Sequence, residues 1–374
     1  MKNKGFDQLE NNLDPVFYSA IEKEVFSGAA VAIFFNEKGV KKRIIKSYGR
    51  TRNDKKGENI TANTFFDLAS LTKPLCTTLC ILSLIENKKL KWTSDLKNSI
   101  RDKKGRCLKK IKIEDLLSHS SGLTDYKPFF KEYEAKYSKK VKKEIIKKIL
   151  LEPLEYEPGE KCLYSDFGFI LLGEIIEQVS GKKLDVYFSE KITMPLQIDK
   201  SLFFRKVSNQ AEKNKNFFAA TEICPWRKRL LQGEVHDEHC WLMGGVAGHA
   251  GLFGTPGGVL KLTEKILQQW RGKEEHPAYS NTLLQKAVGW KKKKQTWCMG
   301  FDRPSGEGSS AGKYLSPSSI GHLGYTGTSF WIDPERELIV VLLTNRVHPT
   351  RKNESIKIFR PLFHNTVIER LNIK

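Results

Sequence analysis

The sequence is short of acidic residues, has no paired-cysteine motif and contains no long uninterrupted apolar run. A membrane-spanning helix needs about 18 predominantly apolar residues, and the most apolar stretch, 75–85, is interrupted by Thr77, Thr78 and Ser83. We expect a buried core helix there. The seven cysteines form no CxxC pair, which is typical of a reducing compartment. The first residues lack the apolar segment of a secretion signal. These features predict a cytoplasmic protein that does not act in a membrane.

The acidic deficit leaves 64 Lys and Arg against 43 Asp and Glu, a net charge of +21. Such a charge suits nucleic acid or another anionic surface, but no helix-turn-helix, zinc-finger or RNA-binding motif accompanies it. We therefore interpret the lysines as a solvated coat and expect no specific nucleic-acid partner. The 374 residues, of which 39% are hydrophobic, suffice for one large domain or two ordinary ones.

Both ends of the chain show strand pairs next to an amphipathic helix. Apolar runs separated by short polar turns predict hairpins, and apolar residues at helical spacing predict helices. The predicted strands are 29–35, 40–48, 329–332 and 338–344, and the predicted terminal helices are 6–26 and 353–371. The economical inference is an α/β (α+β) fold with an antiparallel sheet built from both chain ends and flanked by the terminal helices.

The middle of the chain reads mainly as helices, at 70–87, 113–119, 140–151 and 166–180. Residues 204–258 form a long, irregular, glycine-rich stretch, and such loops are usually functional. We predict a discontinuous α/β domain of residues 1–65 and 246–374, a mostly helical domain of residues 66–245, and an active site between them.

The sharpest chemical signal is Ser70-x-x-Lys73 at the start of an apolar helix. Residues at i and i+3 share one face of a helix, and a helix N-terminus favours developing negative charge. Lys73 could therefore activate the Ser70 hydroxyl. The plainer interpretation is a helix cap followed by a surface lysine, but the apolar context on both sides makes an idle exposed lysine hard to accommodate.

Two further segments follow in the chain. Tyr164 and Asp166 open the helix that ends near Gly181, where Asp166 could also be a simple helix cap. The glycine-rich segment 321–328 leads into the strand at 329 and, taken alone, is only a turn. Ser-x-x-Lys, then Tyr-x-acid, then a basic residue two places before a glycine forms an ordered three-part pattern, and a related set is found in penicillin-interacting enzymes.

With these motifs, the chain resembles the serine hydrolases of the class C β-lactamase and penicillin-binding-protein superfamily, closest to its esterase-like and peptidoglycan-related members. The resemblance runs from about residue 28 to residue 349. The stretches that carry it are 66–73, 116–123, 164–173, 245–252 and 327–334.

The resemblance implies roles for individual residues. Ser70 would be the acylated nucleophile, Lys73 its activating partner and Tyr164 the group that moves the proton. The backbone N–H groups of Ser70 and Tyr325 would form the oxyanion hole. His322 would occupy the position of the family's basic residue on the edge strand.

Two departures from the family pattern concern substrate binding. Asp166 stands where resistance enzymes place Asn, and an ionised carboxylate cannot donate a hydrogen bond to a substrate carbonyl. It would instead hold Lys73 as a cation. His322-Leu323-Gly324 replaces Lys-Thr-Gly, which removes a permanent cation and a hydroxyl. Both changes predict weak activity on β-lactams.

The loop 233–239, together with His249, is rich in possible metal ligands. Metal sites need converging ligands, and no His-Glu-x-x-His helix is present. We expect no metal or other cofactor. In similar proteins this loop borders the cleft, so we expect its residues to contact substrate, His236 among them, or to serve the structure of the loop.

The sequence therefore predicts a serine hydrolase that acts through an acyl-enzyme. Its partner would be a small-molecule ester, or a peptide or muropeptide amide from peptidoglycan. The alternative is a non-catalytic relative of the same fold that binds a muropeptide or a protein. The changes at Asp166 and His322 motivate this alternative, and the intact Ser70, Lys73 and Tyr164 oppose it.

Overall fold

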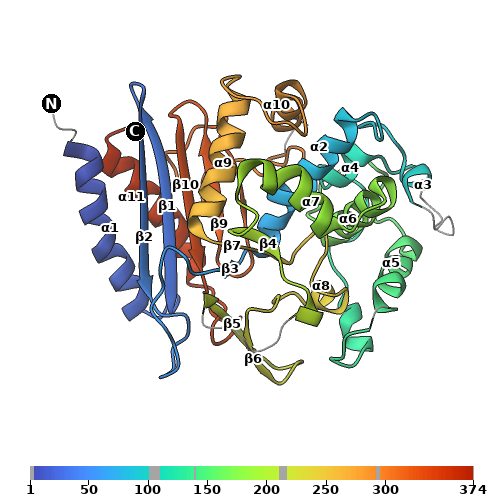
Figure 1. Ribbon diagram of the computed structural model, residues 1–374, viewed down its shortest axis with the longest axis horizontal. Coiled ribbons are helices and arrows are strands. Elements are labelled where there is room, and N and C mark those ends of the chain that lie inside the picture. The colour runs from blue at the N-terminus through green and yellow to red at the C-terminus, as the bar shows by residue number, and fades with distance from the viewer. Residues whose placement is uncertain (1–3, 101–109, 139, 210–216, 292–294, 374) are drawn as a thin grey trace.

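The largest sheet of the computed structural model is built from both ends of the chain (Figure 1). The structure describes residues 4–100, 110–138, 140–209, 217–291 and 295–373. The five strands are antiparallel and lie in the order β2-β1-β10-β9-β8. Their bounds are β1 Gly28–Glu37, β2 Val40–Gly49, β8 Ile320–Leu323, β9 Ser329–Asp333 and β10 Leu338–Thr344.

Strand β1, which lies between β2 and β10, is apolar on both faces because both faces of the sheet are covered. Ala30, Ala32 and Phe34 belong to the core on the side of the helical region. Ala29, Val31 and the other alternate residues belong to a second core, shared with α1 (Lys4–Glu22) and α11 (Ile356–Leu371). This alternation is the two-residue period of a strand. Figure 1 shows α1 and α11 on the outer face and α9 (Pro256–Trp270) on the inner face.

The helical region packs around the segment that carries Ser70 and Lys73. A 3-10 turn, Ala69–Leu71, and a π-helical turn, Lys73–Thr78, lead into α2, Leu79–Glu86. The other helices here are α3 Leu96–Ser99, α4 Ile113–Leu117, α5 Val141–Leu151, α6 Asp166–Ser180, α7 Leu184–Phe188, α8 Glu238–Leu242 and α10 Asn281–Gly289.

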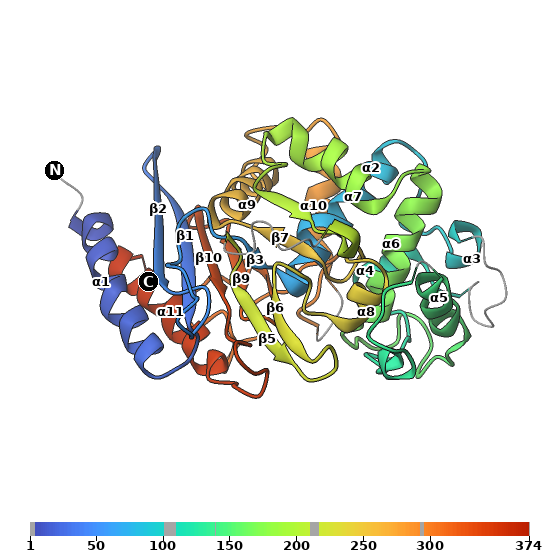
Figure 2. The same ribbon diagram turned by 60° about the horizontal axis from the view of Figure 1, so that its bottom comes forward.

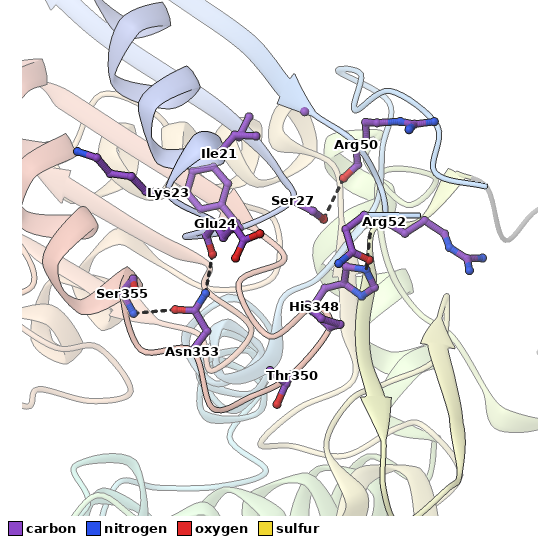
Figure 3. Close-up of a pocket in the computed structure, with 14 residues that line it drawn as sticks. Ile21, Lys23, Glu24, Ser27, Arg50, Arg52, His348, Thr350, Asn353 and Ser355 are labelled. Atoms are coloured by element: carbon purple, nitrogen blue, oxygen red, sulfur yellow. Dashed lines mark hydrogen bonds between the residues drawn. The ribbon is translucent and has the colours of Figure 1, made fainter. Parts of the chain in front are cut away.

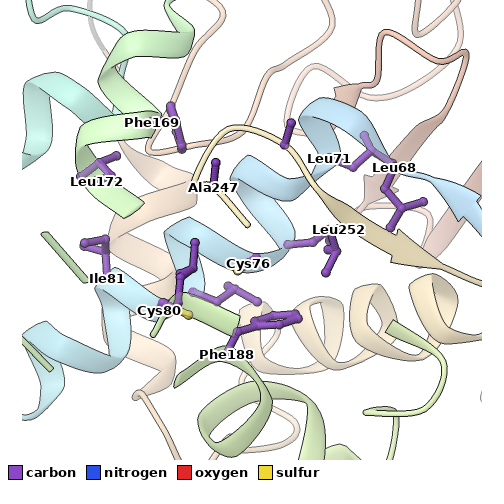
Figure 4. Packing of buried hydrophobic residues seen from close by; sticks show 14 of the residues in the cluster. Leu68, Leu71, Cys76, Cys80, Ile81, Phe169, Leu172, Phe188, Ala247 and Leu252 are labelled. Atoms are coloured by element: carbon purple, nitrogen blue, oxygen red, sulfur yellow. The ribbon is translucent and has the colours of Figure 1, made fainter. Parts of the chain in front are cut away.

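The segment Ala69–Glu86 is long and apolar enough to cross a membrane by composition, but 83% of it is buried inside the protein. Figure 4 shows how Cys76, Cys80 and Ile81 on this segment pack against side chains from α6, α7 and β7. It is therefore the core helix expected from the sequence.

Residues 204–258 contain regular structure that the sequence analysis did not predict. They include the hairpin β5 (Ala220–Cys224) and β6 (Arg229–Gln232), the short helix α8, and strand β7 (Leu252–Gly254). Strand β7 pairs with β3 (Phe66–Asp67) and with β4 (Leu202–Phe204). Figure 2 brings the β5–β6 hairpin forward, between the large sheet and the helices.

The predicted fold class, a sheet from both chain ends with terminal helices and a helical insertion, is confirmed. The division at residues 65 and 246 stays a prediction. One hydrophobic core continues from the inner face of the sheet, at Phe34 and Val341, to Leu79 and Phe169 in the helical region.

Candidate active site

A strained turn presents the hydroxyl of Ser70. The preceding residue, Ala69, has a φ of +47°, a region that non-glycine residues enter only when the surroundings enforce it. The enforcing contacts come from Asp67 and Thr72. Asp67 Oδ1 accepts a hydrogen bond from the Ala69 N–H at 2.9 Å, and the Thr72 hydroxyl donates to the Ala69 carbonyl at 2.7 Å.

Lys73 lies directly beneath Ser70 and is completely buried. Its Nζ donates to Ser70 Oγ at 2.9 Å and to the His249 carbonyl at 3.1 Å, and it lies 2.7 Å from Asp166 Oδ1. Burial alone lowers the pKa of Lys73, but its interactions with Asp166 and Tyr164 outweigh that effect and raise the pKa. The amine is therefore held as a cation.

Asp166 can pair with Lys73 because it is not needed to cap its helix. The cap of α6 is Ser165, whose hydroxyl accepts from the Gly168 N–H at 3.4 Å. Asp166 is the first residue of the helix and points at the lysine instead. The expectation that this carboxylate holds Lys73 charged agrees with the geometry.

The phenol of Tyr164 completes the group. It interacts with both Lys73 and Ser70, and burial raises its pKa although the Lys73 cation opposes this. Lys73 Nζ lies 4.9 Å from the centre of the Tyr164 ring. His119 and Trp297 pack against that ring, with centroids at 4.6 and 5.2 Å. Two segments far apart in the sequence thus bring a hydroxyl, an ammonium and a phenol together.

Ser70 and Tyr325 carry the two backbone N–H groups that are predicted to form an oxyanion hole. The Gly324 carbonyl accepts a hydrogen bond from buried Arg360 at 2.7 Å. In a planar trans peptide the N–H points the opposite way, so this bond fixes the direction of the Tyr325 N–H. Among the described residues, no acceptor meets the N–H of Tyr325 or of Ser70. Both are therefore available to a ligand.

Gly324 has to be a glycine at this point. A Cβ there would lie 2.0 Å from Thr328 Oγ1 and 2.7 Å from the Leu68 carbonyl oxygen. The close approach joins the turn before β9 to the turn that carries Ser70. Thr326 strengthens the junction, since its hydroxyl donates to the Asp67 carbonyl at 2.7 Å.

Ser70 opens into a cavity of about 310 Å³. Of the residues predicted for the site, Tyr164, Asp166, His236 and Tyr325 line it together with Ser70. Sequence reasoning gave no site role to the other lining residues, which are Ala69, Tyr126, Asp237, Glu238, His249, Ala250 and Arg351.

A network of charges forms one wall of this cavity. Glu222, on β5, accepts from His236 Nε2 at 3.1 Å and from Arg351 Nη2 at 2.6 Å. Arg351 also donates to Glu238 at 2.7 Å. Burial by itself raises the pKa of Glu222, but the hydrogen bonds from His236 and Arg351 hold that pKa at about 2. The carboxylate is therefore ionised at neutral pH.

The structure does not bring His322 to the cavity. It lies on the edge strand β8 as expected, but it is 1% exposed and packs near Trp297 and Tyr164. Its Nδ1 bonds the Leu323 carbonyl at 2.8 Å. Burial lowers the pKa of His322 to about 3. The side chain is therefore a neutral group behind Tyr164 and not a cation facing substrate.

The residues of the loop 233–239 pair with other side chains. Glu234 pairs with Arg229 at 2.8 Å, and Asp237 Oδ1 accepts from His249 Nε2 at 2.8 Å. Within the described ranges, no group of three or more His, Cys, Asp or Glu side chains could hold a metal ion.

A larger hollow, of about 770 Å³, lies elsewhere, between the end of α1 and the segment before α11 (Figure 3). Its polar groups largely bond one another: the Ser27 hydroxyl donates to the Arg50 carbonyl, and Asn353 donates to the Glu24 carbonyl. None of the three motifs contributes to its lining. The smaller cavity is therefore the candidate active site.

Comparison with known proteins agrees with this geometry. The β-lactamase family model matches residues 13–362. The chain is 31% identical over 368 residues to the N-acetylmuramyl-L-alanine amidase of Bacillus subtilis. The alignment covers 88% of this chain and 80% of the amidase. The chain is 33% identical over 314 residues to the Escherichia coli K12 protein named "Putative D-alanyl-D-alanine carboxypeptidase", covering 77% of this chain and 70% of that protein.

Solved structures show the same fold at lower identity. EstCE1, a hydrolase with promiscuous acyltransferase activity, superposes with a TM-score of 0.71 at 19% identity, over 95% of this chain and 99% of its own. The octameric penicillin-binding protein homologue from Pyrococcus abyssi gives 0.69 at 19% identity, over 98% and 79%. The chain thus belongs to the β-lactamase family of serine hydrolases, and its relatives include an amidase and proteins named as putative D-alanyl-D-alanine carboxypeptidases.

Proposed function

We propose that this protein hydrolyses an amide bond of a peptidoglycan-derived fragment through an acyl-enzyme on Ser70. The observation that carries the proposal is the convergence of Lys73 and Tyr164 on Ser70 Oγ, with the Lys73 contact at 2.9 Å. A serine hydroxyl is a weak nucleophile until a neighbouring group takes its proton. The same cavity offers two N–H donors for the oxyanion that forms next.

The first step joins Ser70 Oγ to the substrate carbonyl carbon. The Lys73–Tyr164 pair relays protons: it takes the serine proton while giving one of its own to the departing amine, so the pair stays protonated. Asp166 keeps a positive charge beside the reacting oxygen. The N–H groups of Ser70 and Tyr325 stabilise the tetrahedral oxyanion, and collapse of that intermediate leaves the acyl group on Ser70.

The substrate class is supported by the relatives and by the size of the cavity. The names of the amidase and carboxypeptidase relatives both describe amides of peptidoglycan chemistry. A cavity of about 310 Å³ holds the groups on either side of one bond and leaves the rest of a muropeptide outside. A cytoplasmic location, as the sequence leads us to expect, would make recycled fragments the substrate, and fractionation of cells tests this.

The site offers little to the carboxylate of a β-lactam. His322 is neutral and lies outside the cavity lining. Arg351, a cation that lines the cavity, is already paired with Glu222 and Glu238. We therefore propose that β-lactams are poor substrates.

A fluorophosphonate probe and p-nitrophenyl acetate test the nucleophile, and muramyl-L-alanine and D-alanyl-D-alanine peptides test the amide class. We expect labelling of Ser70 and turnover that S70A abolishes. Unlabelled Ser70, or turnover unchanged in S70A, would refute the proposal. Tight muropeptide binding without turnover, equal in both proteins, would instead support the non-catalytic alternative.

A further inference from the structure

His236 has the surroundings of a general base, although it belongs to none of the three motifs. It is 4% exposed and lines the cavity that holds Ser70. Its Nε2 faces Glu222 Oε2 at 3.1 Å. An ionised carboxylate can only accept a hydrogen bond, so Nε2 carries the hydrogen. In the neutral ring the lone pair is therefore on Nδ1.

The Nδ1 atom of His236 is free for a ligand. Within the described part of the chain, this atom has no hydrogen-bond partner. It is also absent from the buried polar atoms that lack a partner, so it is accessible to solvent. A buried imidazole with one nitrogen fixed by a carboxylate and the other open to a reaction cavity resembles the His–Asp part of a catalytic triad.

The position of the His236 ring is fixed from several sides. Its backbone N–H donates to Asp67 Oδ2 at 2.7 Å. The other oxygen of Asp67 holds Ala69, the residue before Ser70. On the opposite side the ring stacks on Tyr325, with centroids 5.7 Å apart. His236 therefore contacts Asp67, which holds the residue before Ser70, and Tyr325. Ser70 and Tyr325 carry the two N–H groups predicted for the oxyanion hole.

The motif residues themselves leave a need for such a base. The pKa of Lys73 is raised by Asp166 and Tyr164 against the effect of burial, and burial raises the pKa of Tyr164. Both are therefore protonated at neutral pH, which suits protonation of a leaving group but not removal of a proton from water. The charged groups facing His236 are Glu222 from β5, Arg351 from the segment after β10, and Asp67 from β3.

We propose that His236, positioned by Glu222, is the general base that activates the water for deacylation of Ser70. The inference rests on the proposed acyl-enzyme. The water oxygen bonds to the acyl carbon while one water proton passes to His236 Nδ1. The bond between that carbon and Ser70 Oγ then breaks, and Oγ takes a proton from Lys73 Nζ. Transfer of the His236 proton back to Lys73 through solvent restores the resting state, so the sum is acyl-serine plus water giving serine and a carboxylic acid.

The test separates acylation from deacylation with p-nitrophenyl acetate in H236Q. We expect the initial burst of nitrophenol to remain and steady turnover to fall by about 10²- to 10⁴-fold, the range for loss of a general base. Intact-protein mass spectrometry should show the acetyl group accumulating on Ser70. A matched control is H276Q, the same substitution at a buried histidine between α9 and α10, which should turn over like the unsubstituted protein.

A second variant, E222Q, tests the positioning role and serves if H236Q does not fold. Glutamine keeps the size of Glu222 but can turn its amide N–H towards His236, so the ring loses its fixed acceptor. The deacylation rate should fall while the initial burst remains. Equal loss of burst and turnover in H236Q, a change in KM alone, or an unchanged deacylation rate in E222Q would overturn the proposal and leave the Ser70 nucleophile intact. Absence of any Ser70 adduct in the unsubstituted protein would instead refute the proposed function.

Discussion

Replacing Asp166 by Asn should free the amine of Lys73 to act as a base. The two charges lie 2.7 Å apart, and at an effective dielectric constant of about 20 their attraction is about 6 kcal/mol. Solvent reduces this figure because 22% of the Asp166 side chain is exposed. An opposite charge at such range typically moves a pKa by about 1 to 3, which corresponds to about 1.4 to 4 kcal/mol.

The sign of the change follows from the environment. Asp166 raises the pKa of Lys73 and burial lowers it, so D166N should lower that pKa. We expect the acid limb of the burst rate with p-nitrophenyl acetate to move down by about 1 to 3 pH units. A burst rate that falls by one factor at every pH, with no movement of the limb, would refute the view that Asp166 keeps Lys73 charged.

The same substitution should affect stability in a pH-dependent way. In D166N we expect the pKa of Lys73 in the folded protein to lie below its value in the unfolded chain. Protonated Lys73 then lowers the free energy of unfolding at neutral pH, and this effect disappears as the pH rises through the unfolded pKa near 10.4. Urea unfolding at pH 7 should show a loss of about 3 kcal/mol, in the range for a broken buried pair, and a smaller loss at pH 10. Equal losses at both pH values would contradict this.

Three further results are expected. Y164F should lower kcat by about 10²- to 10⁴-fold with little change in the thermal midpoint; a kcat within a few-fold of normal would exclude Tyr164 as the proton carrier. Because the pKa of Glu222 is about 2, its contribution to stability is complete above about pH 4.5 and is lost as the pH falls towards 2. The free energy of unfolding of E222Q should therefore fall less between pH 4.5 and pH 2 than that of the unsubstituted protein. The same pH dependence in both proteins would contradict this. Nitrocefin should be hydrolysed slowly, and no faster at pH 5 than at pH 7, because His322 stays neutral in that range. The double variant H322K/L323T should be acylated by nitrocefin faster. Rapid nitrocefin hydrolysis by the unsubstituted protein would refute this.

The parts of the fold that the sequence predicted are those with a strong local pattern. Strand β10 was predicted at its observed bounds, 338–344, because six apolar residues in a row and a threonine follow a turn. The motif Ser70-x-x-Lys73 was informative because positions three apart meet within one helical turn.

The parts that were missed depend on contacts between distant residues. Glu222 and Arg351 are 129 positions apart, so no spacing rule could pair them. The β5–β6 hairpin mixes charged and apolar residues, and it was therefore taken as part of an irregular loop. His322 was expected to be a cation beside the substrate, since its burial depends on Tyr164 and Trp297, which come from other segments.

The pairing of β1 with β10 has a consequence for synthesis of the chain. Ala29 lies opposite Thr344, so the first apolar strand leaves the ribosome more than 300 residues before its partner exists. Until then one edge of that strand can pair with any other exposed strand. The nascent chain must therefore be protected during most of its translation, and fragments that end before residue 338 should aggregate instead of folding.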